Sequence, residues 1–318
     1  MPQIIDKATI IQALAATSPE KLLACMERSF TSYSSGEATV PPVGTLTFEQ
    51  PPGDVHIKYG YLKGSPYYVI KIASGFYDNP LLGLPGSNGL NLVFSQQTGV
   101  LECILLDEGY LTDLRTALAG AVVAKHFAPA QVDRIGIVGT GLQARLQLAQ
   151  LAAVTDCREV IVWGRSAEKM DAYRVDMEAK GFKVSTTVKA IDLTSTCNLI
   201  VTTTPSKTPL LPATGLLPGT LITAMGADTI GKQELDPAIL ERADLIALDS
   251  RSQCIHHGEI HKAWADGLLR EDQLIEIGDV LLTEERFHRA ADHIIVADLT
   301  GIATQDMLIS ELVLDGLK

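Results

Sequence analysis

Apolar residues recur along the chain in two rhythms, one helical and one typical of strands. Over residues 1 to about 36, positions such as Leu22, Met26 and Phe30 keep helical spacing, which predicts two helical segments. From Val40 onward, short apolar runs separated by Pro and Gly turns predict strands instead. The strands predicted there are Leu46–Phe48, His56–Leu62, Tyr67–Ala73, Leu90–Phe94 and Leu101–Leu106.

A helix predicted from about Thr112 leads into a region where short apolar runs alternate with helical spacing. The runs predict strands at Ile135–Val138, Val160–Trp163, Lys183–Val188, Asn198–Thr204, Thr220–Met225, Leu245–Leu248 and His293–Ala297. Helices are predicted at Ala167–Lys180, Pro237–Arg242 and Thr304–Leu314. Strands alternating with helices imply a parallel sheet. We therefore predict an α/β fold: a Rossmann-type doubly wound parallel sheet plus a second, mixed α+β domain.

The first of these strands runs into a glycine turn, Gly139-Thr140-Gly141-Leu142-Gln143-Ala144. Gly139 permits the tight turn, Gly141 lets the backbone approach a pyrophosphate, and Ala144 lets the next helix pack close to the sheet. The helix N-terminus adds free N–H groups and a positive dipole end. Strand, glycine turn, helix and strand in this order favour dinucleotide binding over an ordinary turn. The helix carries apolar positions at Leu142, Leu146, Ala149 and Ala153.

The end of the second strand bears on which dinucleotide is bound. A free ribose 2′-hydroxyl usually meets an acidic residue about 20 residues past the glycines. Here the strand ends Trp163-Gly164-Arg165-Ser166, without a carboxylate. Arg165 can pair with a 2′-phosphate and Ser166 can donate to it, so NADPH is favoured. If Arg165 only caps the strand, NADH enters as well.

The composition and net charge of the chain bear on its binding partners and its cellular compartment. A chain of 318 residues suggests two domains, and 46% hydrophobic with 20% charged residues is ordinary for a soluble protein. A net charge of −12 argues against nucleic acid or an anionic membrane surface. Five scattered cysteines without a CxxC, and the absence of a leader or long apolar run, predict a cytoplasmic protein with reduced thiols.

An acidic protein that binds an anion must place its cations deliberately. Lys71 lies in an otherwise apolar strand, Lys58 in a similar one, and Arg115 near the start of a helix, where cations are usually disfavoured. Each is a candidate substrate ligand. The alternative is a structural ion pair, for Arg115 with Asp113 or Asp107.

Ligands of doubly wound sheets bind at the carboxyl ends of strands. Asp228 lies just past one such end and is a candidate acid or base, or else a helix N-cap. Residues at two neighbouring strand ends are expected to line the cofactor cleft: Thr203, Thr204, Met225 and Gly226.

Histidines cluster near Cys254, in the run Ile255-His256-His257-Gly258-Glu259-Ile260-His261. His257 and His261 would share a face if the run is one helix. Without HExxH or a second ligand group, we expect a polar surface helix and no metal site.

Several blocks of this sequence, in order, resemble the ornithine cyclodeaminase/μ-crystallin family, and the similarity runs from about residue 35 to the C-terminus. The blocks are VIKIASGFYDNPLLGLPGSNGLNLVF (69–94), LTDLRTALAGA (111–121), GIVGTGLQA (136–144), MGADTIGKQE (225–234) and TGIATQD (300–306). The resemblance implies a homodimer. It also implies a substrate and dimerisation domain over 1–118, completed by helix 304–318, and a dinucleotide-binding domain over 119–303.

Carried over by matching position, the resemblance assigns Lys71 and Arg115 to the substrate carboxylate and Asp228 to catalysis. Lys71 would also act in catalysis, and Thr300 and Gly301 would bind substrate. In the glycine turn it matches Gly139, Gly141 and Gln143 to the cofactor, and Thr140 and Leu142 lie beside them.

One departure from the family pattern concerns a cation. Many members have an arginine after the Val-Pro seen here at Val40-Pro41, where this chain continues Pro42-Val43-Gly44. Lys58, in GDVHIKYGYLKG, would supply the missing charge, and that segment resembles the Δ1-pyrroline-2-carboxylate (ketimine) reductase branch.

These features predict NAD(P)H-dependent reduction of a small cyclic imino acid, with Δ1-pyrroline-2-carboxylate giving L-proline as the leading reaction. The alternatives are an ornithine cyclodeaminase that releases ammonia, an alanine dehydrogenase, and an NADPH-dependent binding protein of the μ-crystallin type.

Overall fold

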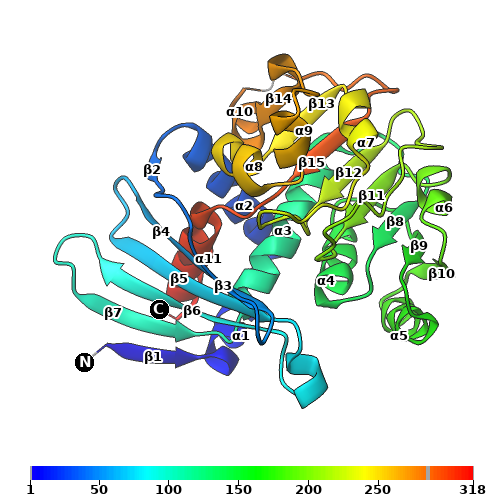
Figure 1. Cartoon of the computed structure of the whole chain (residues 1–318). Helices are drawn as coiled ribbons and strands as arrows, with labels where there is room; N and C mark the ends of the chain where they lie inside the picture. The colour runs from blue at the N-terminus through cyan, green and yellow to red at the C-terminus, as the bar shows by residue number, and fades with distance from the viewer. Residues whose placement is uncertain (1, 284–286, 318) are drawn as a thin grey trace. The chain divides into compact units, whose positions relative to one another are not determined.

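The computed structural model describes residues 2–283 and 287–317. The chain divides into two compact units (Figure 1). Unit 1 comprises Met1–Arg115 and Ile302–Lys318, and unit 2 comprises Thr116–Gly301. The C-terminal segment therefore returns to the unit that holds the N-terminal part of the chain.

Within the described residues, unit 1 is built on a seven-stranded mixed sheet. Its strands are β1 (Gln3–Asp6), β2 (Ala38–Thr39), β3 (Gly44–Phe48), β4 (Gly53–Leu62), β5 (Tyr67–Phe76), β6 (Ser87–Ser95) and β7 (Leu101–Leu106). The order is β1-β7-β6-β5-β4-β2, with β3 also paired to β4. Strands β4 to β7 are antiparallel, whereas β1 lies parallel to β7. The mixed second domain of the predicted fold is thereby confirmed.

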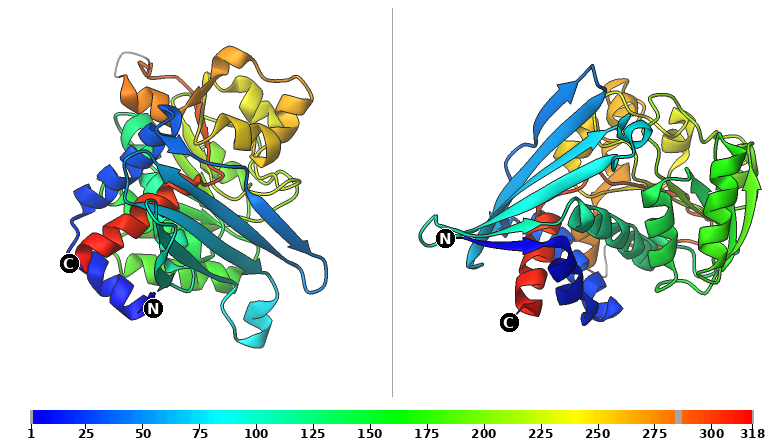
Figure 2. Two further views of the ribbon diagram at one scale, coloured as in Figure 1. Left: turned by 90° about the vertical axis from the view of Figure 1, so that its left-hand side faces the viewer. Right: turned by 90° about the horizontal axis from the view of Figure 1, so that it is seen from below.

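Helices cover one face of this sheet (Figure 2). The helical elements of unit 1 are α1 (Lys7–Ala15), α2 (Pro19–Ser34), η1 (Asn79–Leu82), the start of α3 (Tyr110–Phe127), and α11 (Ala303–Gly316). The C-terminal helix α11 contacts β4, β5 and β6 and packs on α2. Met26 and Phe30 of α2 are fully buried, as their spacing predicted. Ser18 accepts a hydrogen bond from Lys21 N and Pro19 takes the first helical position, which explains where α2 begins.

The prediction for residues 1–36 missed one element. The first residues form β1, which pairs with β7 from Gln3 opposite Cys103 to Asp6 opposite Leu106. Only Ile5 of this strand is buried. Four residues with one buried position give too short a period to be recognised.

The described part of unit 2 is built on an eight-stranded sheet with every neighbouring pair parallel. Its strands are β8 (Ile135–Val138), β9 (Glu159–Trp163), β10 (Lys183–Thr187), β11 (Leu199–Thr202), β12 (Leu221–Ala224), β13 (Leu245–Leu248), β14 (Leu274–Glu276) and β15 (Ile295–Asp298). Their order is β10-β9-β8-β11-β12-β15-β13-β14. A doubly wound parallel sheet is therefore confirmed.

Helices of unit 2 connect these strands. They are α4 (Leu142–Leu151), α5 (Ala167–Glu178), α6 (Ile191–Thr194), α7 (Pro237–Arg242), α8 (Arg251–His257), α9 (His261–Ala265), η2 (Glu271–Gln273) and α10 (Ile277–Leu282), together with the rest of α3. Strand order reverses between β8 and β11, because β9 and β10 lie on one side of β8 and the later strands on the other. Such a switch point is where open α/β sheets bind ligands.

The buried face of α4 differs from the predicted apolar stripe. Leu142 is 54% exposed, while Ala144, Gln147, Leu148 and Leu151 are buried. Gln147 Nε2 donates to Thr116 O at 2.9 Å, so a polar side chain lies on the buried face because it is hydrogen-bonded. The glycine turn positions the helix start, and this orientation leaves Leu142 outward.

Candidate functional site

Three polar side chains lie in register across the sheet of unit 1. Lys58 on β4 stands opposite Lys71 on β5, and Lys71 stands opposite Asn91 on β6. Residues directly opposite on neighbouring strands project from the same face. All three are at most 6% exposed, so this apolar sheet buries two lysines side by side. Buried like charges need a countercharge.

That countercharge comes from the other end of the chain. Asp306 on α11 places Oδ2 3.0 Å from Lys71 Nζ and Oδ1 3.2 Å from Arg115 Nε. Arg115 Nη1 also donates to Gln305 Oε1 at 2.8 Å. We call Lys58, Lys71, Arg115 and Asp306 the cation cluster. Lys71 and Arg115 share the single carboxylate of Asp306, so the cluster can accept an anion.

The pKa values in the cation cluster reflect this crowding. Burial, followed by the charge of Arg115, lowers the pKa of Lys71 to about 7, although Asp306 opposes the shift. Burial alone would raise the pKa of Asp306, but Lys71, Arg115 and Lys58 together hold it below its usual range. An anionic ligand would favour the charged form of Lys71 in the same way as Asp306 does.

Two amide side chains beside the cation cluster have unused hydrogen-bonding capacity. In the described part of the chain, Asn91 Oδ1 and Gln305 Nε2 are buried without a hydrogen-bond partner. Buried polar atoms are normally paired, and an unpaired one calls for an explanation. Donor and acceptor groups next to excess positive charge suit a small polar anion.

The structure corrects two expectations about Arg115. Helix α3 begins at Tyr110, because Asp107 Oδ2 accepts from Leu111 N at 2.7 Å, so Arg115 falls in the second turn and not the first. Burial raises the pKa of Asp107 to about 6. Arg115 forms its ion pair with Asp306, whereas the sequence suggested Asp107 or Asp113 as structural partners of Arg115. Sequence reasoning missed Asp306 even though it ends the block TGIATQD, where an acidic residue on an apolar helix was the available signal.

The glycine turn of unit 2 lies at the switch point between β8 and β11. Gly139 has φ +115°, and a Cβ there would lie 2.7 Å from Thr203 Oγ1. Thr203 N and Oγ1 both donate to Val138 O. Gly141 precedes the first residue of α4 and a Cβ there would meet nothing within 4 Å, so its backbone is open to a ligand. The turn thus has the close packing on one side and the open backbone on the other that a pyrophosphate requires.

The β9 end carries the residues predicted to select the dinucleotide. A Cβ at Gly164 would lie 2.9 Å from both Met170 Cγ and Thr140 Cγ2, so glycine is needed for packing as well as for room. Arg165 is exposed. Ser166 accepts from Lys169 N at 3.3 Å as the N-cap of α5, a contact that leaves its hydroxyl hydrogen able to donate.

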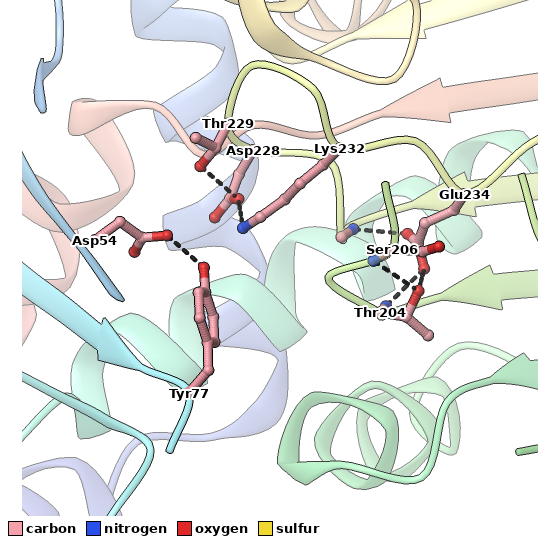
Figure 3. Close-up of polar contacts among 9 residues, drawn as sticks. Asp54, Tyr77, Thr204, Ser206, Asp228, Thr229, Lys232 and Glu234 are labelled. Atoms are coloured by element: carbon pink, nitrogen blue, oxygen red, sulfur yellow. Dashed lines mark hydrogen bonds and ion pairs between the residues drawn. The ribbon is translucent and has the colours of Figure 1, made fainter. Parts of the chain in front are cut away.

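Asp228 lies in a loop after β12 that we call the Asp228 loop, residues 225–234. Asp228 Oδ1 is 2.6 Å from Lys232 Nζ and accepts from Thr229 Oγ1 at 3.2 Å (Figure 3). The Asp228 side chain is 37% exposed and that of Lys232 is 10% exposed. The helix N-cap alternative is wrong, because the next helix is α7, which begins at Pro237 and is capped by Asp236. Asp228 therefore keeps a solvent-accessible carboxylate at a strand end.

Three buried carboxylates hold the strand ends around this loop; we call Glu234, Glu259 and Asp298 the carboxylate cluster. Burial raises the pKa of Asp298 to about 7 and that of Glu259 well above its usual range, and it raises that of Glu234 as well. Each accepts hydrogen bonds from backbone N–H groups, which lower the pKa. Sequence reasoning gave none of them a role.

Thr300 and Gly301 follow β15 and are both bound to Asp249. Thr300 Oγ1 donates to Asp249 Oδ1 at 3.0 Å, and Gly301 N donates to Asp249 Oδ2 at 2.6 Å. Thr300 is 3% exposed, and Gly301 has φ +80°. This geometry fixes the chain just before α11.

The histidine run does not form one helix. Helix α8 ends at His257 and α9 begins at His261, so the prediction that these two histidines share a helix face is wrong. Gly258 is the C-cap of α8, and its extended backbone ends the helix. His261 Nδ1 lies 2.8 Å from Ile255 O. Among residues 2–283 and 287–317, no group of three or more His, Cys, Asp or Glu side chains could hold a metal ion.

A doubly wound sheet with a glycine turn at its switch point is the architecture of dinucleotide-binding proteins. The chain matches the ornithine cyclodeaminase/μ-crystallin family over residues 3–318 and belongs to that family. The family assignment made from the sequence blocks is confirmed. Its members include oxidoreductases and cyclodeaminases.

Relatives with several named activities cover most of the chain. A Rhizobium meliloti protein, named only provisionally as a dehydrogenase, is 40% identical over 91% of this chain and 88% of its own. The iminosuccinate reductase of Paracoccus denitrificans is 31% identical over 95% and 93%, respectively. A Δ1-pyrroline-2-carboxylate reductase of Bacillus thuringiensis is 26% identical over 87% and 86%.

Two solved structures share the fold along nearly the whole chain. An archaeal alanine dehydrogenase dimer with bound NAD has a TM-score of 0.89 and 30% identity, covering 99% of this chain and 95% of that one. The Thermococcus litoralis Δ1-pyrroline-2-carboxylate reductase, in complex with NADH and L-proline, has a TM-score of 0.91 and 21% identity, covering 99% and 97%. In the described residues of the present chain, no helix is both long and apolar enough to cross a membrane.

Proposed function

We propose that this protein reduces a small cyclic α-imino acid with NAD(P)H, and that its substrate is Δ1-pyrroline-2-carboxylate, which gives L-proline. The observation that carries the proposal is the cation cluster, in which two buried cations, Lys71 and Arg115, share the one buried carboxylate of Asp306. A buried excess of positive charge is costly unless an anion joins it. The carboxylate of an α-imino acid has the required charge and size.

Arg115, Lys71 and Lys58 would bind this carboxylate. A guanidinium offers two parallel donors to a carboxylate, and the lysines add point charges. Asp306 keeps Arg115 and Lys71 in place, so the carboxylate meets cations that are already oriented. Holding the carboxylate fixes the adjacent imine carbon, and such positioning supplies much of the rate enhancement of a hydride transfer.

Asp228 would act on the imine nitrogen. A protonated imine is a cation, and an ionised carboxylate beside it stabilises the charge and makes the imine carbon a better hydride acceptor. Reduction consumes the imine, a hydride and a proton and yields the secondary amine.

The glycine turn fits the dinucleotide cofactor that this reaction needs. Gly139 packs where a side chain would collide with Thr203, and Gly141 presents open backbone. Residues 139–143 would hold the pyrophosphate, and the residues after β11 and β12, Thr203, Thr204, Met225 and Gly226, would line the cleft. When bound, the reduced dinucleotide supplies the hydride.

NADPH is the proposed preference, because an exposed Arg165 and a half-buried Ser166 follow β9 where a carboxylate would select NADH. Arg165→Ala should raise KM for NADPH about tenfold, since a charge-assisted contact is lost, and leave KM for NADH unchanged. Lys180→Ala, at an exposed cation that lies past the opposite end of α5, is the control. Equal effects of Arg165→Ala on both cofactors would remove Arg165 from the specificity argument.

We also propose a homodimer in which unit 1 is the dimerisation domain. The sheet face opposite Lys58 and Lys71 carries partly exposed apolar side chains, among them Tyr59 and Tyr61 on β4 and Ile70 on β5. A contiguous apolar patch on a sheet marks an interaction surface. Light scattering of the purified protein, with Tyr59→Lys as the disruptive variant, tests this.

The substrate is tested by supplying Δ1-pyrroline-2-carboxylate and following the oxidation of NADPH and NADH in parallel. We expect rapid oxidation and formation of proline. Ammonia release from ornithine without net cofactor oxidation would favour a cyclodeaminase, and reduction only of pyruvate with ammonia would favour an alanine dehydrogenase. Tight NADPH binding with no turnover of any of these would favour a binding protein.

A further inference from the structure

The carboxylate of Glu234 joins two loops that leave neighbouring strands of unit 2. Glu234 is fully buried at the end of the Asp228 loop. Its Oε1 accepts from Thr204 N at 2.6 Å and from Thr204 Oγ1 at 2.7 Å. Its Oε2 accepts from Gly226 N at 2.9 Å and from Thr202 Oγ1 at 2.7 Å. Figure 3 shows part of this arrangement.

The two backbone donors occupy equivalent places. β11 and β12 are parallel neighbours, with Thr202 opposite Ala224, so Thr204 and Gly226 each lie two residues beyond a strand end. Past that point the ladder of backbone hydrogen bonds between the strands has ended, and the loops would separate. Glu234 replaces the ladder with one side chain that binds both loops.

A carboxylate is required here for a geometric reason. The two N–H groups bind opposite oxygens, and an N–H can only donate. A glutamine offers one acceptor oxygen and one NH₂ group, so whichever way its amide turns, one of the two N–H groups faces a donor. The threonine hydroxyls can rotate to accept, but Thr204 N and Gly226 N cannot.

Both loops carry residues of the proposed site. Thr204 lies beside Gly139, because a Cβ at Gly139 would come 3.2 Å from Thr204 Cγ2. The loop that contains Thr204 therefore forms a wall of the glycine turn. Gly226 is two residues before Asp228, and a Cβ at Gly226 would come 2.1 Å from Thr204 O. The two loops therefore touch through backbone atoms at the point that Glu234 holds.

Glu234 is itself held in place. Glu234 N and Leu235 N both donate to the buried carboxylate of Glu259, at 3.1 Å and 2.7 Å to its Oε1. Gln233 N donates to Ser206 O at 2.7 Å. The Asp228 loop is thus fixed at its far end, next to the loop that follows β11.

We propose that Glu234 is a positioning residue that fixes Asp228 relative to the glycine turn, an inference that rests on the proposed role of Asp228. By binding Gly226 N and Thr204 N at once, it sets the distance between the proton-handling carboxylate and the wall against which the dinucleotide would lie. Its effect should therefore appear in the chemical step and not in substrate capture.

The test compares Glu234→Gln with Glu234→Asp and with Thr202→Val. We expect Glu234→Gln to lower kcat about 10²-fold, the size of effect that small misplacements of reacting groups produce, with KM for the imine nearly unchanged. Glu234→Asp keeps two acceptor oxygens and should retain more of the activity. Thr202→Val removes one hydroxyl donor to the same buried carboxylate but leaves both backbone contacts, so it should keep its kcat.

Amide hydrogen exchange provides a readout that needs no substrate. In Glu234→Gln, exchange should accelerate in peptides covering 203–206 and 225–234, and not in β8 or β15. A kcat for Glu234→Gln equal to wild type, or a loss matched by Thr202→Val, would overturn the proposal. If the wild type reduces no imine while the exchange pattern holds, the proposed function fails and the link between the loops stands.

Discussion

Two clusters in this molecule bury ionisable groups of like sign, and they stabilise those groups in different ways. The cation cluster of unit 1 sets Lys71 and Arg115 against the one carboxylate of Asp306, and Asn91 Oδ1 and Gln305 Nε2 beside it have no hydrogen-bond partner among the described residues. The carboxylate cluster of unit 2 gathers three buried carboxyl groups, each of which accepts hydrogen bonds from backbone N–H donors. A cluster with excess charge and unpaired amide atoms is suited to a ligand, whereas one filled with backbone contacts is suited to holding loops.

The largest expected effect on kcat comes from Asp228, whose partly exposed carboxylate belongs to neither cluster. Asp228→Asn should lower kcat by about 10²- to 10⁴-fold, because a neutral amide neither stabilises a protonated imine nor exchanges its proton. The melting temperature should fall by about 4 °C or less, since Asp228 is more than a third exposed. Steady-state kinetics and calorimetry check both parts. Wild-type kcat in this variant would remove Asp228 from the mechanism.

Loss of a cation should weaken substrate binding before it affects the chemical step. Arg115→Ala should raise KM for the imino acid about 10²-fold, as expected when one partner of a buried charge pair is truncated. Arg174→Ala, which breaks an exposed ion pair with Asp171 on α5, is the matched control and should leave KM unchanged. An unchanged KM in Arg115→Ala would mean that the cation cluster does not bind the substrate carboxylate.

The pH dependence of KM sharpens the comparison at Lys71. Because its pKa is about 7, Lys71 loses its charge as pH rises through that value, and KM should rise with it. Lys71→Arg should flatten this dependence, since arginine stays charged. Asp306→Asn removes a charge that raises the pKa of Lys71, so the rise should move to lower pH. Parallel KM profiles from pH 6 to 9 for the three proteins measure the shift; superimposable curves would contradict it.

The smallest expected effect is on stability, and the two clusters should give opposite slopes. Asp298 has a folded pKa of about 7, well above its unfolded value, so the folded state binds more protons and stability should fall as pH rises toward 7. Lys71 has a folded pKa of about 7 below an unfolded value of about 10.4, so its contribution should rise with pH above 7.

Glu259→Gln isolates the carboxylate part of this dependence. Both backbone donors can reach Oε1 of Glu259, so a glutamine can accept the same two bonds without the cost of a buried charge. Denaturant unfolding should show a shallower fall with pH in this variant and equal or greater stability at pH 8. A steeper fall would mean that the Glu259 charge stabilises the fold.

The fold could be predicted because its signals are local. The glycine turn and the alternation of apolar runs with helical spacing each act over a few residues. Strand β1 and the three-residue β14 escaped because they are too short to show a period.

The site was only partly predictable, because its electrostatics are not local. Lys71 in an apolar strand implied a partner, but nothing near it in sequence identified Asp306. Glu234 looked like one acid among many until the two strand ends that it joins were placed side by side. The roles given to Lys58, Lys71, Arg115, Asp228 and the cofactor residues stay predictions.

The most direct test of the central claim uses NADPH deuterated at the transferable C4 position, with Δ1-pyrroline-2-carboxylate as substrate. Mass spectrometry of the product should show proline carrying one deuterium at the α-carbon, formed in proportion to the NADPH consumed. Unlabelled proline formed from ornithine with release of ammonia, and no labelled proline from the imine, would contradict the account and identify a cyclodeaminase.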